Sequence, residues 1–424
     1  MGTVVADPSP TSTSSAASSA PIELTWKGRV LTRTEVLRIY VWGSALLLAL
    51  GVGLNWLLTD GAWYVRGNTK YDAQYLRWNA YDVVSGVILV ASLVLLGIGF
   101  LWRARRRHIA RALGFLVFGF YWGTQAMKLY VAEEGDFVNA IFAMFGVFFF
   151  NYFAYHELVS FKRDEDPRAL AWLTGTAFIT TGVYFVTHKI QAIAYWLILR
   201  VSEETQWLLQ AFGQGTVRCG GVPDGSMIYY PQIPEIGCDS GGYFLVQIIL
   251  ACTAIQSMMI FVGGIFALRP PRLGDGVSGK ATRFERLRPT YGSRRFWALM
   301  LTVPLIYVLN LFRNVIIIWM SGQEQAVSFL WWKTHDEVFW FSHNIIGKGG
   351  SLVALIIIAF IVFQILPELY DSIIGLLDLK ERRGPLEQAL FGGRGRGGVG
   401  VPKAAPLDGA PVPSPSPPPE PRPE

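Results

Sequence analysis

The sequence predicts an all-α protein that crosses a membrane about eight times. Of its 424 residues, 52% are hydrophobic and only 16% are charged, whereas soluble domains carry about 25% charged residues. The apolar residues are gathered in long runs, each close to the roughly 20 residues that a membrane-spanning helix needs. This composition excludes a soluble enzyme, a nucleic-acid-binding protein and a disordered hub protein.

Eight apolar runs have the length of a membrane-spanning helix. The first follows too long and too polar a leader to be a cleaved signal peptide, so we expect it to be retained. The predicted spans cover residues 38–58, 82–102, 112–131, 137–159, 169–187, 243–267, 296–320 and 349–367.

The positions of Lys and Arg predict the orientation, because cytoplasmic loops are enriched in these residues. They cluster in residues 103–111 and again in residues 268–295. These two loops are therefore predicted to be cytoplasmic, while the segment at 188–242 faces outward. Eight crossings place the N- and C-termini on the same, cytoplasmic side of the cell membrane.

Composition divides the chain into three parts. Residues 1–22 are rich in Ser, Thr, Ala and Pro, and residues 380–424 turn to Gly and then Pro. Neither buries enough apolar surface to offset the entropy of ordering, so both are predicted to be disordered tails, the second in the cytoplasm. Residues 23–379 form the predicted multi-pass domain.

The outward segment begins with a stretch, residues 190–212, in which bulky apolar residues such as Trp196 and Trp207 alternate with charged ones. The pattern is typical of a helix in the membrane interface, with tryptophans at the depth of the lipid headgroups. Two interpretations stay open: a plain packing helix, or a surface that receives a substrate arriving along the bilayer.

Two of the three cysteines, Cys219 and Cys238, bracket a loop rich in Gly and Pro within the same segment. Outside the cytoplasm disulfides persist, and a bridge closing this loop would stabilise it by about 3 kcal/mol. The alternative is a two-cysteine metal site, which lacks nearby His partners. We therefore predict a disulfide and no metal or cofactor. Cys252 is left unpaired.

Polar residues inside a span are costly and mark candidate functional sites. Arg313 shares one helix face with Asn310 and Asn314, which makes this face either an interhelical polar clamp or part of a site. Counted from the outer ends of their spans, Cys252 and Arg313 both lie roughly 10–14 Å below the outer surface. Gln256 follows Cys252 by four residues, which predicts an amide on the same face as the thiol.

A histidine near the outer end of the last span completes a reactive set. His343 lies closer to the membrane boundary than its competitor His335. A cation favours the thiolate form of a cysteine such as Cys252, a histidine carries protons, and a guanidinium such as that of Arg313 stabilises an oxyanion. The three residue types together suit acyl transfer through a thioester.

Three short blocks, Ala251–Met258, Asn310–Val315 and His343–Lys348, resemble the archaeosortase/exosortase family in the same order. The resemblance extends over residues 100–370. It implies a multi-pass membrane cysteine protease-transpeptidase that acts on exported proteins. Those substrates carry a C-terminal sorting signal composed of a short motif, a hydrophobic helix and basic residues. The resemblance also implies transfer of the new C-terminus to an acceptor such as a membrane lipid.

Matched by position, the resemblance implies that Cys252 is the nucleophile and Arg313 the conserved arginine of the family. His343 takes the third position, where family members carry either His or Arg, and Gln256, Asn310 and Asn314 would support these groups. Two other classes of protein stay open. One is a transporter that binds its substrate at Arg313, and the other is a membrane scaffold without catalytic activity.

Overall fold

The computed structural model describes residues 25–26, 29–59, 80–102, 104–132, 137–214, 216–220, 234–238, 244–270, 290–322, 335–381 and 384–391. The chain forms two compact units, one of residues Arg38–Arg382 and one of Met1–Leu37 with Arg383–Glu424. The larger unit contains every residue of the predicted active site.

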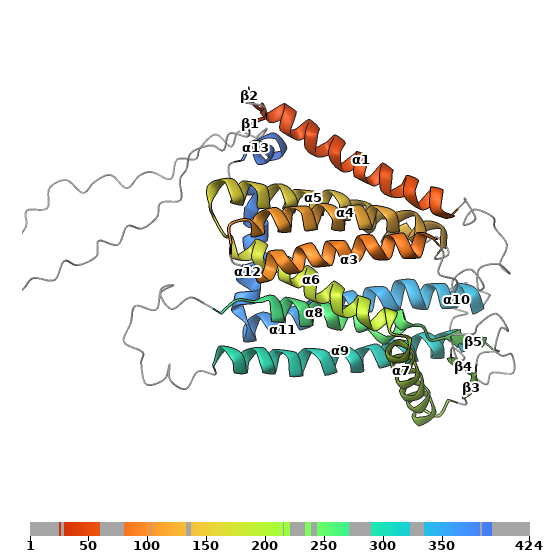
Figure 1. Ribbon diagram of the computed structural model, residues 1–424. Coiled ribbons are helices and arrows are strands. Elements are labelled where there is room, and N and C mark those ends of the chain that lie inside the picture. Colours follow the sequence, from red (N-terminus) through yellow and green to blue (C-terminus); the bar gives the residue numbers. More distant parts are fainter. Residues whose placement is uncertain are drawn as a thin grey trace, which may run out of the picture. The chain divides into compact units, whose positions relative to one another are not determined.

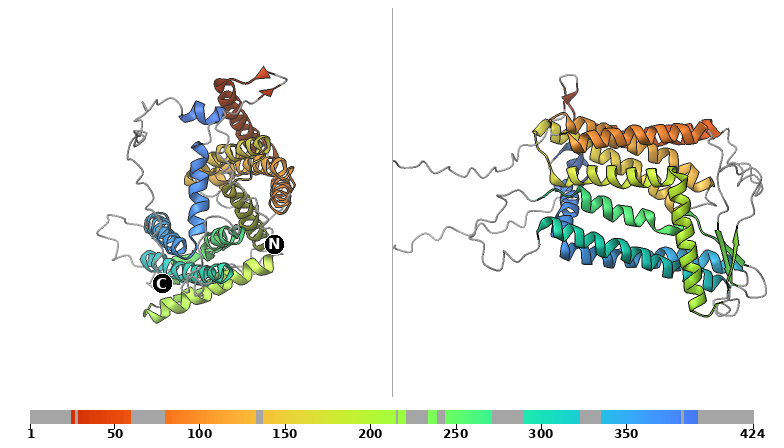
Figure 2. Two further views of the ribbon diagram at one scale, coloured as in Figure 1. Left: turned by 90° about the vertical axis from the view of Figure 1, so that its left-hand side faces the viewer. Right: turned by 60° about the horizontal axis from the view of Figure 1, so that its bottom comes forward.

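Helices make up most of the larger unit. Figure 1 shows α3 to α6, α8, α9 and α11 side by side, with α7 across one end of the bundle and α12 across the other, and Figure 2 shows the same arrangement. The helices are α1 (Arg33–Thr59), α3 (Ala80–Leu101), α4 (Arg107–Ala132), α5 (Phe137–Arg163), α6 (Arg168–Lys189), α7 (Gln191–Ala211), α8 (Ile255–Ala267), α9 (Tyr291–Gly322), α10 (His335–Phe341), α11 (Lys348–Ile365) and α12 (Pro367–Leu377).

Within the described residues, six helical stretches are long and apolar enough to cross a membrane: α1, α3, α5, α6, α9 and the stretch Glu337–Ile365. The predicted spans at 112–131 and 243–267 are not among them. The first corresponds to α4, which is long enough but begins with Arg107 and contains Arg111 and Lys128. The helical bundle agrees with the predicted fold class, and the count of eight crossings stays a prediction.

The predicted span at 243–267 is wrong in its first half. Phe244–Gln247 forms strand β5, Leu250–Thr253 forms the 3-10 turn η2, and only Ile255–Ala267 is helical, as α8. Hydropathy does not separate these conformations, because residues 244–253 are as apolar as a helix and contain neither Gly nor Pro. The break places Cys252 at the entrance of a short helix.

A small antiparallel sheet lies at the α7 end of the bundle (Figure 1). Its strands are β3 (Thr216–Gly220), β4 (Pro234–Cys238) and β5, in the order β3-β4-β5. Cys219 lies opposite Glu235 and Cys238 opposite Thr216 in the register. The side chains of both cysteines lie outside the described part of the structure, so the disulfide stays a prediction.

Close packing against α6 holds the short helix α8 in place. A Cβ on Gly263 would lie 2.0 Å from the Thr180 Oγ1, so only glycine permits this approach of the two helices. The Thr180 hydroxyl donates to the Met259 carbonyl at 3.0 Å, and the Trp172 indole donates to the Gly264 carbonyl at 2.8 Å. These contacts hold the middle of α8 against α6.

The smaller unit contains the strands β1 (Thr25–Trp26) and β2 (Arg29–Val30) and the helix α13 (Pro385–Phe391). The tail predicted to be disordered from residue 380 therefore begins with ordered structure, because Pro385 starts a short apolar helix. The predicted N-terminal tail at 1–22, the C-terminal residues from 392 onward and most of the basic loop at 268–295 lie outside the described residues.

Candidate active site

Cys252 lies in η2, between β5 and α8. Its backbone amide donates to the Ile249 carbonyl at 2.8 Å. The turn ends at Ala254, whose φ of 57° is left-handed, and α8 begins at Ile255. A residue other than glycine in this conformation costs of order 1 kcal/mol. The strained turn places Cys252 two residues before the N-cap of α8.

Cys252 lies in a 3-10 turn and Gln256 in α8, with the left-handed Ala254 between them, so the shared face predicted for one continuous α-helix does not apply. The Gln256 amide instead donates to the Tyr184 hydroxyl on α6 at 3.0 Å. Gln256 thus ties α8 to α6 and is exposed to the surroundings.

The polar face of α9 holds the turn that carries Cys252. Asn310 and Asn314 are both buried, and both donate their side-chain amides to the Cys252 carbonyl, at 2.6 and 3.0 Å. A single carbonyl oxygen with two lone pairs is thereby fully satisfied. The face predicted from the three- and four-residue spacing therefore contacts the cysteine through its backbone.

Arg313 lies on the same stretch of α9, between the two asparagines. Its guanidinium is close enough to the Cys252 thiol for the two groups to interact electrostatically. Its Nε is buried and has no hydrogen-bond partner among the described residues. Gly347 packs against the Arg313 side chain so closely that a Cβ on Gly347 would lie 3.0 Å from the Arg313 Nε.

His343 lies in a continuous helical stretch that leads into the last span. α10 continues through the π-helical turn η5 (Ser342–Gly347) into α11, and π-helical turns are frequent at functional sites. The His343 ring stacks on Phe339 with centroids 5.5 Å apart. His335, its competitor, has a side chain outside the described part of the structure.

One hydrophobic cluster contacts both the Cys252 turn and Phe339, on which the His343 ring stacks. Cys252 and Phe339 are partly buried against it, so Phe339 links His343 to the surroundings of the thiol. The core of the cluster consists of Val201, Leu209, Val246, Ile248, Leu311, Val315 and Ile318. The structure thus brings Cys252, Asn310, Arg313 and Asn314 together. His343 lies on the turn η5, which contacts Arg313 through Gly347.

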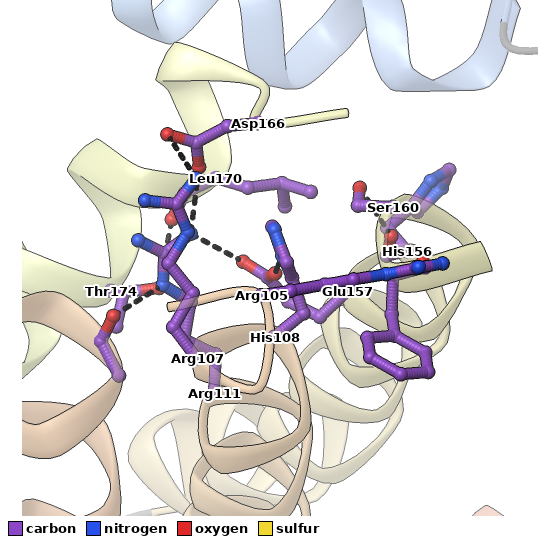
Figure 3. Close-up of polar contacts among 12 residues, drawn as sticks. Arg105, Arg107, His108, Arg111, His156, Glu157, Ser160, Asp166, Leu170 and Thr174 are labelled. Carbon is purple, nitrogen blue, oxygen red and sulfur yellow. Dashed lines mark hydrogen bonds and ion pairs between the residues drawn. The ribbon is translucent and has the colours of Figure 1, made fainter. Parts of the chain in front are cut away.

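A second polar cluster lies between α4, α5 and α6 (Figure 3). His108 Nδ1 is 2.6 Å from Glu157 Oε2, and the Arg111 Nη1 is 3.5 Å from the other oxygen of Glu157. All three side chains are almost fully buried. Sequence reasoning missed this cluster, because Arg111 was counted as a loop residue whereas it lies in the first turns of α4.

Asp166, between α5 and α6, connects three arginines. It lies 3.2 Å from Arg111, 3.0 Å from Arg107 and 3.1 Å from Arg269. Burial raises the pKa of Asp166, but the three guanidinium groups outweigh it, so the pKa stays below its usual value. Several of the arginines that predict the orientation are therefore also structural ion-pair partners.

No family model and no solved structure matches this chain. A curated relative is archaeosortase A of Haloferax volcanii, which is 28% identical over 136 residues. The match covers 30% of this chain and 38% of the relative, so the chain spans well under half the length of that protein. Over this stretch the chain is similar to archaeosortase A.

Proposed function

We propose that the protein is a membrane cysteine transpeptidase with Cys252 as its nucleophile. The observation that carries this proposal is the pair of hydrogen bonds from Asn310 and Asn314 to the Cys252 carbonyl, with Arg313 between the two asparagines and next to the thiol. An interhelical clamp alone needs neither a thiol nor a guanidinium at that place. The similarity to archaeosortase A supports the same reaction class.

The proposed topology has eight crossings, with both termini in the cytoplasm and Cys252 near the outer face. α4 packs between α3 and α5, and its 26 residues span about 39 Å, which is enough for a bilayer. α8 spans only about 20 Å with its 13 residues, so its outer half is replaced by η2 and β5. Irregular backbone is tolerated at membrane depth where it lines a site enclosed by protein.

The distribution of charge supports this orientation. Cys252 precedes the N-terminus of α8, and Arg269 follows its C-terminus. The cluster of Asp166 with its three arginines therefore lies at the opposite end of α8 from the thiol, on the side that the positive-inside rule assigns to the cytoplasm.

In the first half-reaction the Cys252 thiol gives its proton to His343, and the sulfur attacks the carbonyl carbon of the scissile peptide bond. The Nε–H of Arg313, which has no other acceptor among the described residues, stabilises the oxyanion that forms. The carbon–nitrogen bond then breaks, the leaving amine takes the proton from His343, and a thioester to Cys252 remains.

In the second half-reaction an acceptor amine, hydroxyl or water attacks the thioester. Its proton passes to His343 and on to the departing Cys252 sulfur as the carbon–sulfur bond breaks. We propose exported proteins with a C-terminal sorting signal as substrates, their hydrophobic helix docking among the spans. A membrane lipid is the proposed acceptor, as the resemblance to archaeosortases implies.

Replacing Cys252 by Ala tests this function in the host cell. The exported proteins of wild-type and Cys252→Ala cells are compared by mass spectrometry of their mature C-termini, at equal levels of the membrane protein. We expect a set of proteins that keep their hydrophobic C-terminal segment only in the variant. Identical C-termini in both strains would refute the function.

A transporter with Arg313 as its substrate-binding residue is the second candidate. It is favoured by the interrupted helix around α8, since broken helices commonly form binding sites in transporters. In that case Cys252→Ala keeps full function and Arg313→Gln loses it, whereas the transpeptidase loses activity in both variants.

A further inference from the structure

Helix α7 covers the Cys252 turn with one of its faces. The opposite face carries Trp196 and Trp207, which are 56% and 65% exposed, while Val201 and Leu209 on the covered face are fully buried. The buried face packs on η2 and α9 and belongs to the hydrophobic cluster that includes Cys252. Figure 2 shows α7 crossing the ends of the bundle helices.

Two hydroxyl groups on this buried face lack hydrogen bonds. Ser202 and Thr205 are 0% exposed, and within the described part of the structure neither the Ser202 Oγ nor the Thr205 Oγ1 has a partner. Spaced three residues apart and interleaved with Val201 and Leu209, both lie on the side of α7 that faces the Cys252 turn.

Among the described helices Thr176 on α6 also has a buried hydroxyl without a partner, but other buried hydroxyls are bonded. A buried hydroxyl in a helix usually donates to the carbonyl four residues earlier. Thr174, Thr302 and Ser321 do so, at 2.8, 2.5 and 2.7 Å. Buried polar groups without partners are unfavourable and call for an explanation. The helices that carry them here, α7 with the two hydroxyls and α9 with the unpaired Nε of Arg313, both contact the Cys252 turn.

We propose that the buried face of α7 is the second side of the peptide-binding site, and that Ser202 and Thr205 are substrate-positioning residues. When a peptide enters between α7 and η2, their hydroxyls donate to its backbone carbonyls. This inference rests on the proposed transpeptidase function and names a part of its substrate site.

The spacing favours a peptide backbone over other ligands. Side chains three residues apart on a helix are about 5–6 Å apart. In an extended peptide, alternate residues lie about 6.6 Å apart and face the same side. Two hydroxyls with this separation match two backbone carbonyls on one side of an extended peptide. We propose that this peptide runs past Cys252.

The double variant Ser202→Ala/Thr205→Val tests this role, because it removes both hydroxyls and keeps the apolar volume. The probes are acetyl-Ala-Ala vinyl sulfone, which offers a peptide backbone, and iodoacetamide, which does not. Both alkylate cysteine, and the rate of modification of Cys252 is measured in the full-length protein. We expect the rate with the peptidyl probe to fall about tenfold, the loss expected from roughly two weak hydrogen bonds, and the rate with iodoacetamide to stay unchanged.

Thermal unfolding supplies the structural readout. Removing hydroxyls that lack partners should leave the melting temperature unchanged or raise it. The matched control is Thr302→Val. The Thr302 hydroxyl donates to a carbonyl of its own helix, α9, so this variant should keep the wild-type ratio of the two rates.

Three results would overturn the inference: a lower melting temperature of the double variant, equal loss with both probes, or no loss with either. If Cys252 of the wild-type protein reacts with neither probe, both the inference and the proposed function fail. If the wild type prefers the peptidyl probe and the double variant keeps that preference, only the inference fails.

Discussion

The side-chain amide of Asn314 donates a hydrogen bond to the carbonyl oxygen of Cys252 at 3.0 Å, across 62 residues of sequence. This bond fixes an irregular turn against a regular helix. It therefore couples the position of the thiol to the polar face of α9, where Arg313 lies. Precise placement of reacting groups is worth a large part of a rate enhancement.

Asn310 and Asn314 should behave as one unit, because both donate to the same oxygen of Cys252. Either Asn→Leu substitution leaves one donor, so we expect each single variant to lower the rate of Cys252 modification only about threefold. The double variant leaves the buried carbonyl unpaired, which costs about 1–3 kcal/mol. Its loss of rate and of thermal stability should exceed the combined losses of the single variants. Additive losses would show that the two bonds act independently.

Gly347 should be required beside Arg313. In Gly347→Ala the new methyl group would lie 2.9 Å from the Ile317 Cδ1 and 3.0 Å from the Arg313 Nε. The guanidinium must then move, and we expect a drop of about tenfold or more in C-terminal processing. Gly349→Ala is the matched control, because a Cβ there meets nothing within 4 Å. Equal activity of both variants would show that the position of Arg313 does not matter.

Arg111 should be needed for stability. Its side chain is fully buried and lies near both Glu157 and Asp166. Arg111→Ala removes a buried cation from both carboxylates, and removing one partner of a buried ion pair typically costs about 3–5 kcal/mol. The exposed Arg106 is the control, and Arg106→Ala should change the free energy of unfolding by less than about 0.5 kcal/mol. Denaturation in detergent measures both, and a stable Arg111→Ala protein would contradict the ion-pair network.

The stability should also depend on pH through Asp166. Its pKa in the folded protein lies below the usual value of an aspartate, because three guanidinium groups surround it, so the folded state favours the charged carboxylate. The resulting stabilisation is complete above the unfolded pKa and is lost as the pH falls through the lower, folded value. Asp166→Asn should be less stable than the wild type at pH 7, with a difference in melting temperature that shrinks below pH 4. A constant difference would contradict this role.

The sequence predicts the parts of the site that lie on regular helices. The spacing of Asn310, Arg313 and Asn314 predicts one helix face, and the structure confirms that this face meets the Cys252 turn. The chain at Cys252 itself was predicted as helix, because apolar residues precede it and no Gly or Pro marks the break. The left-handed Ala254 depends on tertiary contacts that no local pattern reveals.

The buried polar groups were the hardest to predict. Arg111 pairs with Asp166, 55 residues away, so its burial depends on contacts between distant helices. Ser202 and Thr205 resemble ordinary helix hydroxyls in sequence, since most of these bond their own backbone. Only the three-dimensional structure separates the satisfied hydroxyls from those without partners.

The most direct test of the central claim is the rate at which a membrane-impermeant peptidyl vinyl sulfone labels Cys252 from outside intact cells. The wild type is compared with Arg313→Lys at equal protein level, since an ammonium lacks the planar fork of the guanidinium. We expect labelling of Cys252 in the wild type and a rate about tenfold or more lower in Arg313→Lys. An unlabelled Cys252 in the wild type, or equal rates in the two proteins, would contradict it.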